Sequence, residues 1–321
     1  MKTLNIAHRG GAQLMPENTL AGFADAMARS CDGAELDVQL TRTGVVVVHH
    51  DFRLKPGLAR HNGVWLTEAG PRIKDLSFRE LQQFDVGTAQ PDSGYANAHP
   101  LLQPMDAGIP TLADVATLIA NRPFRLFVEL KCNTSEDSAD PVMLADATFA
   151  ITGTRAIYVG FDWRALARIR QLGGTCWFTT DKLPEGPSGH PKPVIDAIAK
   201  AGGQGWFPNF ADATIDGVAY ARLQGLKVGA WTVNDPADMR RLMHLDAICT
   251  DRPDLLASIL GPLATGSGSE SGSVPSVRFG SRNAERFYCV SAKTVWSAAQ
   301  ILRCCVFSMR KNAKAFMAFQ K

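Results

Sequence analysis

Residues 4–40 read LNIAHRGGAQLMPENTLAGFADAMARSCDGAELDVQL, and the rest of the fold is predicted outward from them. The apolar runs Leu4–His8 and Ala34–Leu40 are typical of strands. Between them, Thr19–Arg29 has the pattern of a helix, and Asn18 is a candidate N-cap. A helix that joins two strands is the usual crossover between parallel neighbours. The sequence therefore opens with a β-α-β unit.

The same alternation continues to about residue 260. Further strand candidates are Arg125–Leu130, Ala156–Phe161, Thr175–Thr179, Gly205–Pro208, Lys227–Val233 and Ala247–Thr250. Helix candidates are Trp163–Leu172, Pro193–Ala201, Thr214–Leu223, Pro236–Met243 and Pro253–Leu260. Strands that alternate with helices predict a parallel sheet covered by its crossover helices.

The segment Val45–His50 breaks this alternation. It follows the second strand after only Thr41-Arg42-Thr43-Gly44, and such a tight turn joins antiparallel strands, whereas parallel neighbours need a longer connection. We therefore expect a hairpin arm beside Ala34–Leu40. About eight parallel strands remain, the number that closes a (β/α)8 TIM barrel in roughly 250 residues. The alternative is an open doubly wound sheet, which is disfavoured because no Gly-x-Gly-x-x-Gly turn follows the first strand.

Two segments lie outside the regular pattern. Residues 52–110 are too long for a simple loop and contain one short helical stretch, Phe78–Phe84, so we predict an insertion over the carboxyl-terminal face of the barrel. The barrel domain is predicted to span residues 1–261. Residues 262–321 begin with a Gly/Ser-rich linker, and apolar positions 295, 299, 302 and 306 then follow a helical spacing. This tail is either a weakly ordered extension or a helix for a membrane surface or a partner.

Charge and cysteine content exclude several classes of protein. The net charge is +3, but residues 262–321 hold nine basic and two acidic residues, a charge of +7 that leaves −4 for residues 1–261. A mildly acidic body argues against nucleic-acid binding. The seven cysteines have neither zinc-site nor disulfide spacing, which indicates a reducing compartment. Neither a signal-peptide stretch nor a run of about 18 apolar residues is present, so we expect a cytoplasmic protein without a transmembrane segment.

Two carboxylates on the second predicted strand are the first candidates for chemistry. Glu35 and Asp37 are two residues apart, so their side chains point to the same side of the strand. Two like charges that are buried together repel each other strongly unless a cation or a proton compensates them. A divalent hard cation suits such oxygen ligands. Acid pairs also occur at exposed strand ends, so this pair alone leaves both interpretations open.

Further reactive side chains lie at the ends of other predicted strands. His8 and Arg9 end the first strand, His50 ends the hairpin arm, and Glu129 and Lys131 end the next parallel strand. The active sites of (β/α)8 barrels lie at the carboxyl ends of the strands. A single histidine there is usually a structural residue, but this combination predicts a reaction centre.

An ordered set of short motifs carries a family resemblance. The motifs are His8-Arg9-Gly10, Pro16-Glu17-Asn18-Thr19, Glu35-Leu36-Asp37-Val38, His50-Asp51, Glu129-Leu130-Lys131, Trp231-Thr232-Val233-Asn234 and Thr250-Asp251-Arg252-Pro253. In this order they closely resemble the glycerophosphodiester phosphodiesterases over about Ile6–Leu260. The fold of that family is a (β/α)8 barrel, which agrees with the strand count. The tail after Gly261 is not part of the resemblance.

The resemblance implies hydrolysis of small glycerophosphodiesters to sn-glycerol 3-phosphate and an alcohol, with Mg²⁺ or Ca²⁺ as the metal, in lipid and glycerol metabolism. The residues it implies are the metal ligands Glu35, Asp37 and Glu129, the acid/base pair His8 and His50, and the substrate-binding residues Arg9, Lys131 and Trp231. One imidazole can take a proton from the attacking hydroxyl while a protonated one supplies the leaving alcohol. Trp231 can equally fill the top of the barrel, and Asn234 and Asp251 fit supporting or capping roles better than catalysis.

Two stretches depart from the family pattern. An extra histidine, His49, precedes His50, and neighbouring residues on a strand point to opposite faces, so the motif favours His50. The segment Phe52–Asn62 (FRLKPGLARHN) lacks the Leu-Asp-Arg-Thr-Thr-like stretch of the family, which leaves the preferred alcohol undetermined.

Two other functions use the same residue types. The first is a lyase of the same barrel type, similar to sphingomyelinase D, in which the substrate's own hydroxyl displaces the alcohol and a cyclic phosphate is released. The second is a phosphate- or lipid-binding module without catalysis, which is disfavoured because every histidine and metal-ligand candidate is present. The sequence gives no indication of the oligomeric state.

Overall fold

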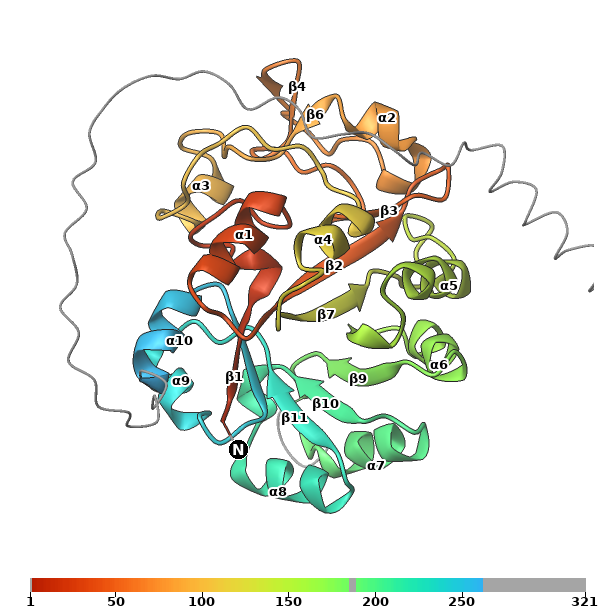
Figure 1. The fold of residues 1–321 in the computed structure, drawn as a ribbon, viewed down its shortest axis with the longest axis vertical. Coiled ribbons are helices and arrows are strands. Elements are labelled where there is room, and N and C mark those ends of the chain that lie inside the picture. The colour runs from red at the N-terminus through yellow and green to blue at the C-terminus, as the bar shows by residue number, and fades with distance from the viewer. Residues whose placement is uncertain (1, 185–188, 262–321) are drawn as a thin grey trace, which may run out of the picture. The chain divides into compact units, whose positions relative to one another are not determined.

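Within residues 2–184 and 189–261, which the structure describes, eight parallel strands form a closed ring (Figure 1). The structure is a computed structural model. In pairing order the strands are β1 (Leu4–Ala7), β2 (Gly33–Leu40), β7 (Arg125–Leu130), β8 (Ala156–Gly160), β9 (Thr175–Thr180), β10 (Gly205–Pro208), β11 (Lys227–Ala230) and β12 (Ala247–Thr250). Parallel pairing of β12 with β1 closes the ring. The predicted (β/α)8 barrel is confirmed, and the open-sheet alternative is wrong.

Helices between the strands cover the outside of the ring (Figure 1). They are α1 (Leu20–Ala28), α4 (Leu112–Leu118), α5 (Pro141–Thr152), α6 (Trp163–Gln171), α7 (Lys192–Lys200), α8 (Ile215–Leu223), α9 (Pro236–Arg241) and α10 (Pro253–Leu260). Helices α4 and α5 are not predicted from the sequence, although both carry a start signal. Thr111 and Asp114 form a capping box at α4, and Asp140 caps α5 just before a proline.

The predicted N-cap of α1 is wrong by one residue. The hydroxyl of Thr19, not the side chain of Asn18, accepts the hydrogen bond from the backbone N–H of Gly22, at 3.1 Å. Asn18 is buried, has a φ of 57°, and donates its side-chain amide to Asp37 on β2. The loop before α1 therefore delivers a polar side chain into the barrel mouth.

The hairpin arm is present. Strand β3 (Val46–Val48) is antiparallel to β2, with Val38 opposite Val48. It is shorter than predicted, so His49 and His50 follow its end. The backbone N–H of His49 donates to the carbonyl oxygen of Asp37 at 2.9 Å. The arm thereby brings both histidines back to the carboxylates of β2.

The residues between β3 and α4 form the predicted insertion. It contains a small sheet of β4 (Arg60–His61), β5 (Val64–Trp65) and β6 (Phe84–Asp85), and the helices α2 (Phe78–Leu81) and α3 (Gly94–Ala98). Helix α2 confirms the predicted helical stretch. The insertion has an apolar cluster of its own around Leu54, Ile73 and Leu81. The hydroxyl of Tyr95 on α3 donates to Glu17 at 2.9 Å, which joins the insertion to the barrel mouth.

Apolar side chains fill two layers of the barrel. Inside the ring, Phe127 packs edge-on against Trp177 with ring centroids 5.3 Å apart. Outside, a larger cluster that includes Phe23 and Leu36 lies between strands and helices. Burial of this surface, at about 25 cal/mol per Å², is the main force that holds helices and strands together. Successive side chains of β2 point alternately to the inside and the outside of the ring, so Glu35 points inward and Leu36 points outward.

Three predictions about the chain as a whole stay predictions. In the described part, no helix is long and apolar enough to cross a membrane. The linker and basic tail at 262–321 lie outside the described residues. The domain boundary at residue 261 and the cytoplasmic location likewise stay predictions.

Candidate active site

Three carboxylates converge inside the barrel mouth. One oxygen each of Glu35, Asp37 and Glu129 lies within 4.8 Å of the others. Strands β2 and β7 are parallel neighbours with Asp37 in register with Glu129, so the pairing of the sheet itself brings these side chains together. The structure thus assembles the three residues that the sequence proposes as metal ligands.

Neighbouring cations compensate the charge of Asp37 better than that of Glu35. Burial, and then repulsion by Asp37 and Glu129, raise the pKa of Glu35 well above its usual range. Burial also opposes the charge on Asp37, but His50 and Arg9 outweigh it and hold that pKa well below its usual range. Among the described residues, the buried Oε1 atom of Glu35 has no hydrogen-bond partner. An unpartnered carboxylate oxygen between two other carboxylates fits a hard divalent cation.

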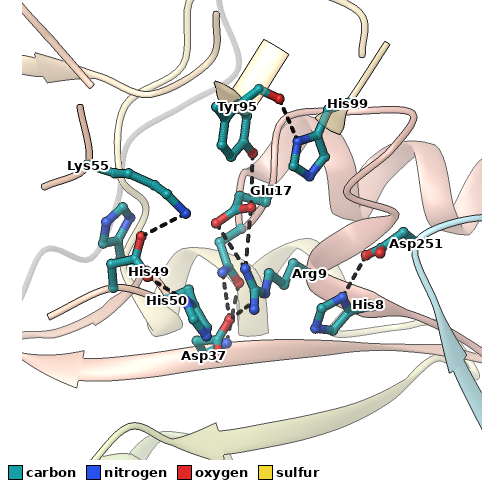
Figure 2. A network of polar contacts seen from close by, with 12 residues as sticks. His8, Arg9, Glu17, Asp37, His49, His50, Lys55, Tyr95, His99 and Asp251 are labelled. Carbon is teal, nitrogen blue, oxygen red and sulfur yellow. Dashed lines mark hydrogen bonds and ion pairs between the residues drawn. The ribbon is translucent and has the colours of Figure 1, made fainter. Parts of the chain in front are cut away.

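Arg9 lies among these acids (Figure 2). Its backbone N–H donates to Glu35 at 3.2 Å, its Nη1 atom is 3.3 Å from Glu17, and its Nε atom is 3.3 Å from Asp37. Burial opposes its charge, but the carboxylates, Glu17 foremost, raise the pKa of Arg9 further. A φ of 50° at Arg9 starts a left-handed turn, and a Cβ at the following Gly10 would come within 2.9 Å of the backbone of α1. The turn therefore requires the glycine of the His-Arg-Gly motif.

Lys131 is the second cation of the centre. Its Nζ atom lies 2.7 Å from Glu129 Oε1 and 3.7 Å from Asp37 Oδ1. Burial opposes its charge, but attraction by Glu129 and Asp37 outweighs burial and raises the pKa of Lys131. The ammonium group is therefore held against two of the candidate ligands, at the edge of the carboxylate cluster.

Each candidate catalytic histidine is held by an aspartate (Figure 2). The Nδ1 atom of His8 lies 2.6 Å from Asp251, and the Nδ1 atom of His50 lies 2.7 Å from Asp51. A carboxylate at Nδ1 fixes the tautomer and leaves Nε2 for the reaction. The Nε2 atom of His8 lies 3.8 Å from Glu35, beside the candidate metal ligands.

Some supporting residues were found from the sequence and others were not. Asn234 donates to Asp251 at 2.6 Å, which agrees with the supporting role expected for this pair. The motif that contains Glu17 and Asn18 was visible, but their contacts to Arg9 and Asp37 were not foreseen. Tyr95 carries no local sequence signal, because its role depends on how the insertion folds back.

His49 and Trp231 occupy distinct places. His49 is only 4% exposed, burial lowers its pKa, and its Nε2 atom lacks a partner in the described part of the chain. Trp231 follows β11 and donates its indole N–H to the carbonyl of Phe207 at 3.1 Å. Its ring meets the partly exposed Phe161 edge-on at 5.5 Å. These two rings form an aromatic wall at the barrel mouth.

Clustered carboxylates, buried cations and two aspartate-bound histidines at the strand ends of a (β/α)8 barrel form a site that can bind and hydrolyse a phosphodiester. Residues 8–255 match the Glycerophosphoryl diester phosphodiesterase family, and the chain belongs to this family. Its family identifies it as a glycerophosphodiester phosphodiesterase.

Individual relatives agree with this assignment. A glycerophosphodiester phosphodiesterase from Caldanaerobacter subterraneus subsp. tengcongensis is 28% identical over 81% of this chain and 98% of its own length. A crystal structure from Silicibacter pomeroyi DSS-3, assigned to the same family, is 33% identical and has a TM-score of 0.74 over 81% of this chain and 93% of the other. A phosphodiesterase from Oleispira antarctica in complex with the product sn-glycerol 3-phosphate shares the fold, at 23% identity and a TM-score of 0.63 over 79% of this chain and 95% of the other.

Proposed function

We propose that this protein hydrolyses glycerophosphodiesters to sn-glycerol 3-phosphate and an alcohol, with a divalent metal ion at Glu35, Asp37 and Glu129. The observation that carries the proposal is the buried carboxylate cluster with its unpartnered Glu35 oxygen, beside two oriented histidines. Family membership supports the substrate class. The product in the Oleispira antarctica complex, sn-glycerol 3-phosphate, is the product that the proposal assigns here.

The donor set suits either Mg²⁺ or Ca²⁺, since both prefer carboxylate oxygens. When bound, such an ion polarises a non-bridging phosphate oxygen as a Lewis acid. Arg9 and Lys131 lie next to the three ligands and are positioned to bind the remaining phosphate oxygens. The aromatic wall of Phe161 and Trp231 gives the glycerol an apolar surface to lie against.

His8 and His50 are the proposed acid/base pair. Because each imidazole donates from Nδ1 to an aspartate, Nε2 is the atom that exchanges protons with the substrate. A neutral Nε2 accepts a proton from the attacking water, and a protonated Nε2 donates a proton to the oxygen of the leaving alcohol. Asp251 and Asp51 stabilise the imidazolium that forms during each transfer.

Phosphorus NMR of the products tests this function. With glycerophosphoglycerol or glycerophosphoethanol and added Mg²⁺, we expect a phosphomonoester, sn-glycerol 3-phosphate, to accumulate from the first turnover. If a cyclic glycerol phosphate is released instead, the protein is a lyase. If it binds both substrates without converting them, it is a binding module.

Glu35→Gln is expected to stabilise the metal-free protein while removing metal binding. The raised pKa of Glu35 means that its ionisation costs folding free energy as the pH rises above the ordinary carboxyl range, and glutamine removes this cost. A gain of about 1 kcal/mol raises Tm by about 2–4 °C in domains of about 150–250 residues, and a shift of this order is expected here. The measurement is thermal unfolding in EDTA and in Mg²⁺ at neutral pH.

Glu129→Gln is the matched control for that experiment. Glu129 has Lys131 at 2.7 Å, so its replacement breaks an ion pair and should not raise the Tm of the metal-free protein. Both variants should lose the Tm increase that Mg²⁺ gives the wild type. A lower Tm for Glu35→Gln in EDTA would mean that the Glu35 charge is already compensated in the metal-free protein.

Deletion of residues 264–321 is expected to leave turnover of a soluble glycerophosphodiester almost unchanged. All proposed site residues lie between His8 and Asp251, and the family match ends at residue 255. The measurement is kcat and KM of the shortened chain after its folding is verified by circular dichroism. If the shortened chain folds but is inactive, part of the site lies in the deleted segment.

A further inference from the structure

A pocket of about 600 Å³ lies in the insertion. Its wall includes Lys55, Leu66, Gln90, Ser93, Tyr95 and His99. Lys55 belongs to the segment Phe52–Asn62, which departs from the family pattern. The volume suits a small organic group. We call it the alcohol pocket; its wall contains none of the proposed metal ligands, acid/base histidines or phosphate-binding residues.

Two lining residues, Lys55 and Tyr95, each contact a carboxylate that in turn binds a residue of the reaction centre (Figure 2). Lys55 Nζ lies 3.4 Å from Asp51, the aspartate that holds His50. The hydroxyl of Tyr95 donates to Glu17, which in turn pairs with Arg9. The pocket thus adjoins both a proposed proton donor and a proposed phosphate ligand.

The chemistry of the pocket disfavours a cationic alcohol. The ammonium group of Lys55 lies over the ring of Tyr95, 5.5 Å from its centroid, and His99 stacks on the same ring at 4.2 Å. Figure 2 shows Lys55 and His99 on opposite sides of this ring. A quaternary ammonium group, which binds aromatic faces, would find these faces covered and a like charge beside them.

A polyhydroxyl alcohol finds matching groups in the same place. Lys55 is 42% exposed and offers charged N–H donors. His99 donates from Nδ1 to the backbone carbonyl of Tyr95, which leaves its Nε2 as an acceptor when the ring is neutral. The Gln90 amide and the Ser93 hydroxyl add further donors and acceptors to the wall.

We propose that the alcohol pocket binds the leaving alcohol and selects polyhydroxyl alcohols, such as glycerol or inositol, over quaternary ammonium alcohols such as choline. The inference rests on the proposed hydrolysis of glycerophosphodiesters and names the substrate class of that reaction. The aromatic wall of Phe161 and Trp231 receives the glycerol that stays on the phosphate.

The test compares kcat/KM for glycerophosphoglycerol, glycerophosphocholine and glycerophosphoethanol, whose short alcohol serves as the reference for each variant. The wild type should prefer glycerophosphoglycerol over glycerophosphocholine by at least about tenfold, as one charge-assisted hydrogen bond allows. Lys55→Met should reduce this preference about tenfold. Lys192→Met is the matched control, because Lys192 also lies over a tyrosine ring, Tyr220 at 5.0 Å, but outside the pocket. It should keep the preference.

Gly94→Trp tests the pocket without touching the contact between Lys55 and Asp51. In the described part of the chain, a Cβ at Gly94 would have no atom within 4 Å, so the indole adds bulk to the pocket. We expect it to lower kcat/KM for glycerophosphoglycerol relative to glycerophosphoethanol.

The outcomes separate this proposal from the function on which it rests. A wild-type preference for glycerophosphocholine would overturn the selectivity. Unchanged ratios in both pocket variants, with normal hydrolysis of glycerophosphoethanol, would overturn the pocket and leave the proposed function standing. Absence of hydrolysis of all three substrates would overturn the proposed function and this inference with it.

Discussion

Exhaustive treatment with EDTA is expected to abolish the turnover of glycerophosphodiesters, and Mg²⁺ or Ca²⁺ is expected to restore it. Four acids of the centre face two buried cations, Arg9 and Lys131, and these acids are Glu17, Glu35, Asp37 and Glu129. With every acid ionised, the cluster therefore keeps two negative charges that a divalent ion would neutralise. Without that ion, an anionic phosphodiester would meet net negative charge at the position where it must bind.

The measurement is kcat before chelation, after removal of both EDTA and metal, and after addition of each ion. Circular dichroism should show that the metal-free protein stays folded, because the apolar clusters of the barrel do not depend on the ion. Elemental analysis should confirm that far less than one metal ion per chain remains. Full activity in such a sample would contradict the metal assignment. The phosphate charge would then be stabilised by the cations Arg9 and Lys131 without a metal ion.

The barrel could be predicted because the sequence patterns that mark its strands and helices are local. Each strand is a short apolar run and most helices have clear boundaries, so alternation alone gives the parallel sheet. The hairpin arm followed from the length of a single turn, Thr41–Gly44. Helices α4 and α5 escaped prediction, although the capping residues Thr111 and Asp140 mark their starts.

The supporting contacts of the site could not be predicted, because they depend on tertiary structure. The partner of His8 is Asp251, 243 residues further along the chain. The contact between Tyr95 and Glu17 spans 78 residues and exists only because the insertion folds back onto the barrel. A motif lists residue types, but closure of the ring decides which of them meet.

Asn18 illustrates the same limit at short range. Its position before a helix suggested a cap, and a cap would have kept its side chain local. The left-handed φ at Asn18 instead aims its amide at Asp37 on a neighbouring strand, and Thr19 takes over the cap. The competition between a local and a tertiary hydrogen bond is decided here by the tertiary one.

His50→Ala is expected to lower kcat/KM by about 10²–10⁴-fold, the usual contribution of a general acid or base. The Nδ1 atom of His50 is bound to Asp51 and its ring lies beside Asp37, so its loss removes a proton carrier at the substrate. His49→Ala should leave kcat/KM close to that of the wild type. The His49 ring is buried without a partner for Nε2 in the described residues, and burial lowers its pKa.

The two substitutions should also differ in stability, in the opposite order. Removing the buried His49 ring leaves a cavity and should cost about 1–3 kcal/mol of unfolding free energy, whereas His50 has a side chain that is 29% exposed and should cost less. Urea unfolding and the Tm increase in Mg²⁺ verify that each variant folds and binds metal before its kinetics are compared. If His49→Ala were the inactive variant and His50→Ala were active, the arm would present the other histidine to the substrate. The acid/base pair would then be His8 and His49, and the contact between His50 and Asp51 would be structural.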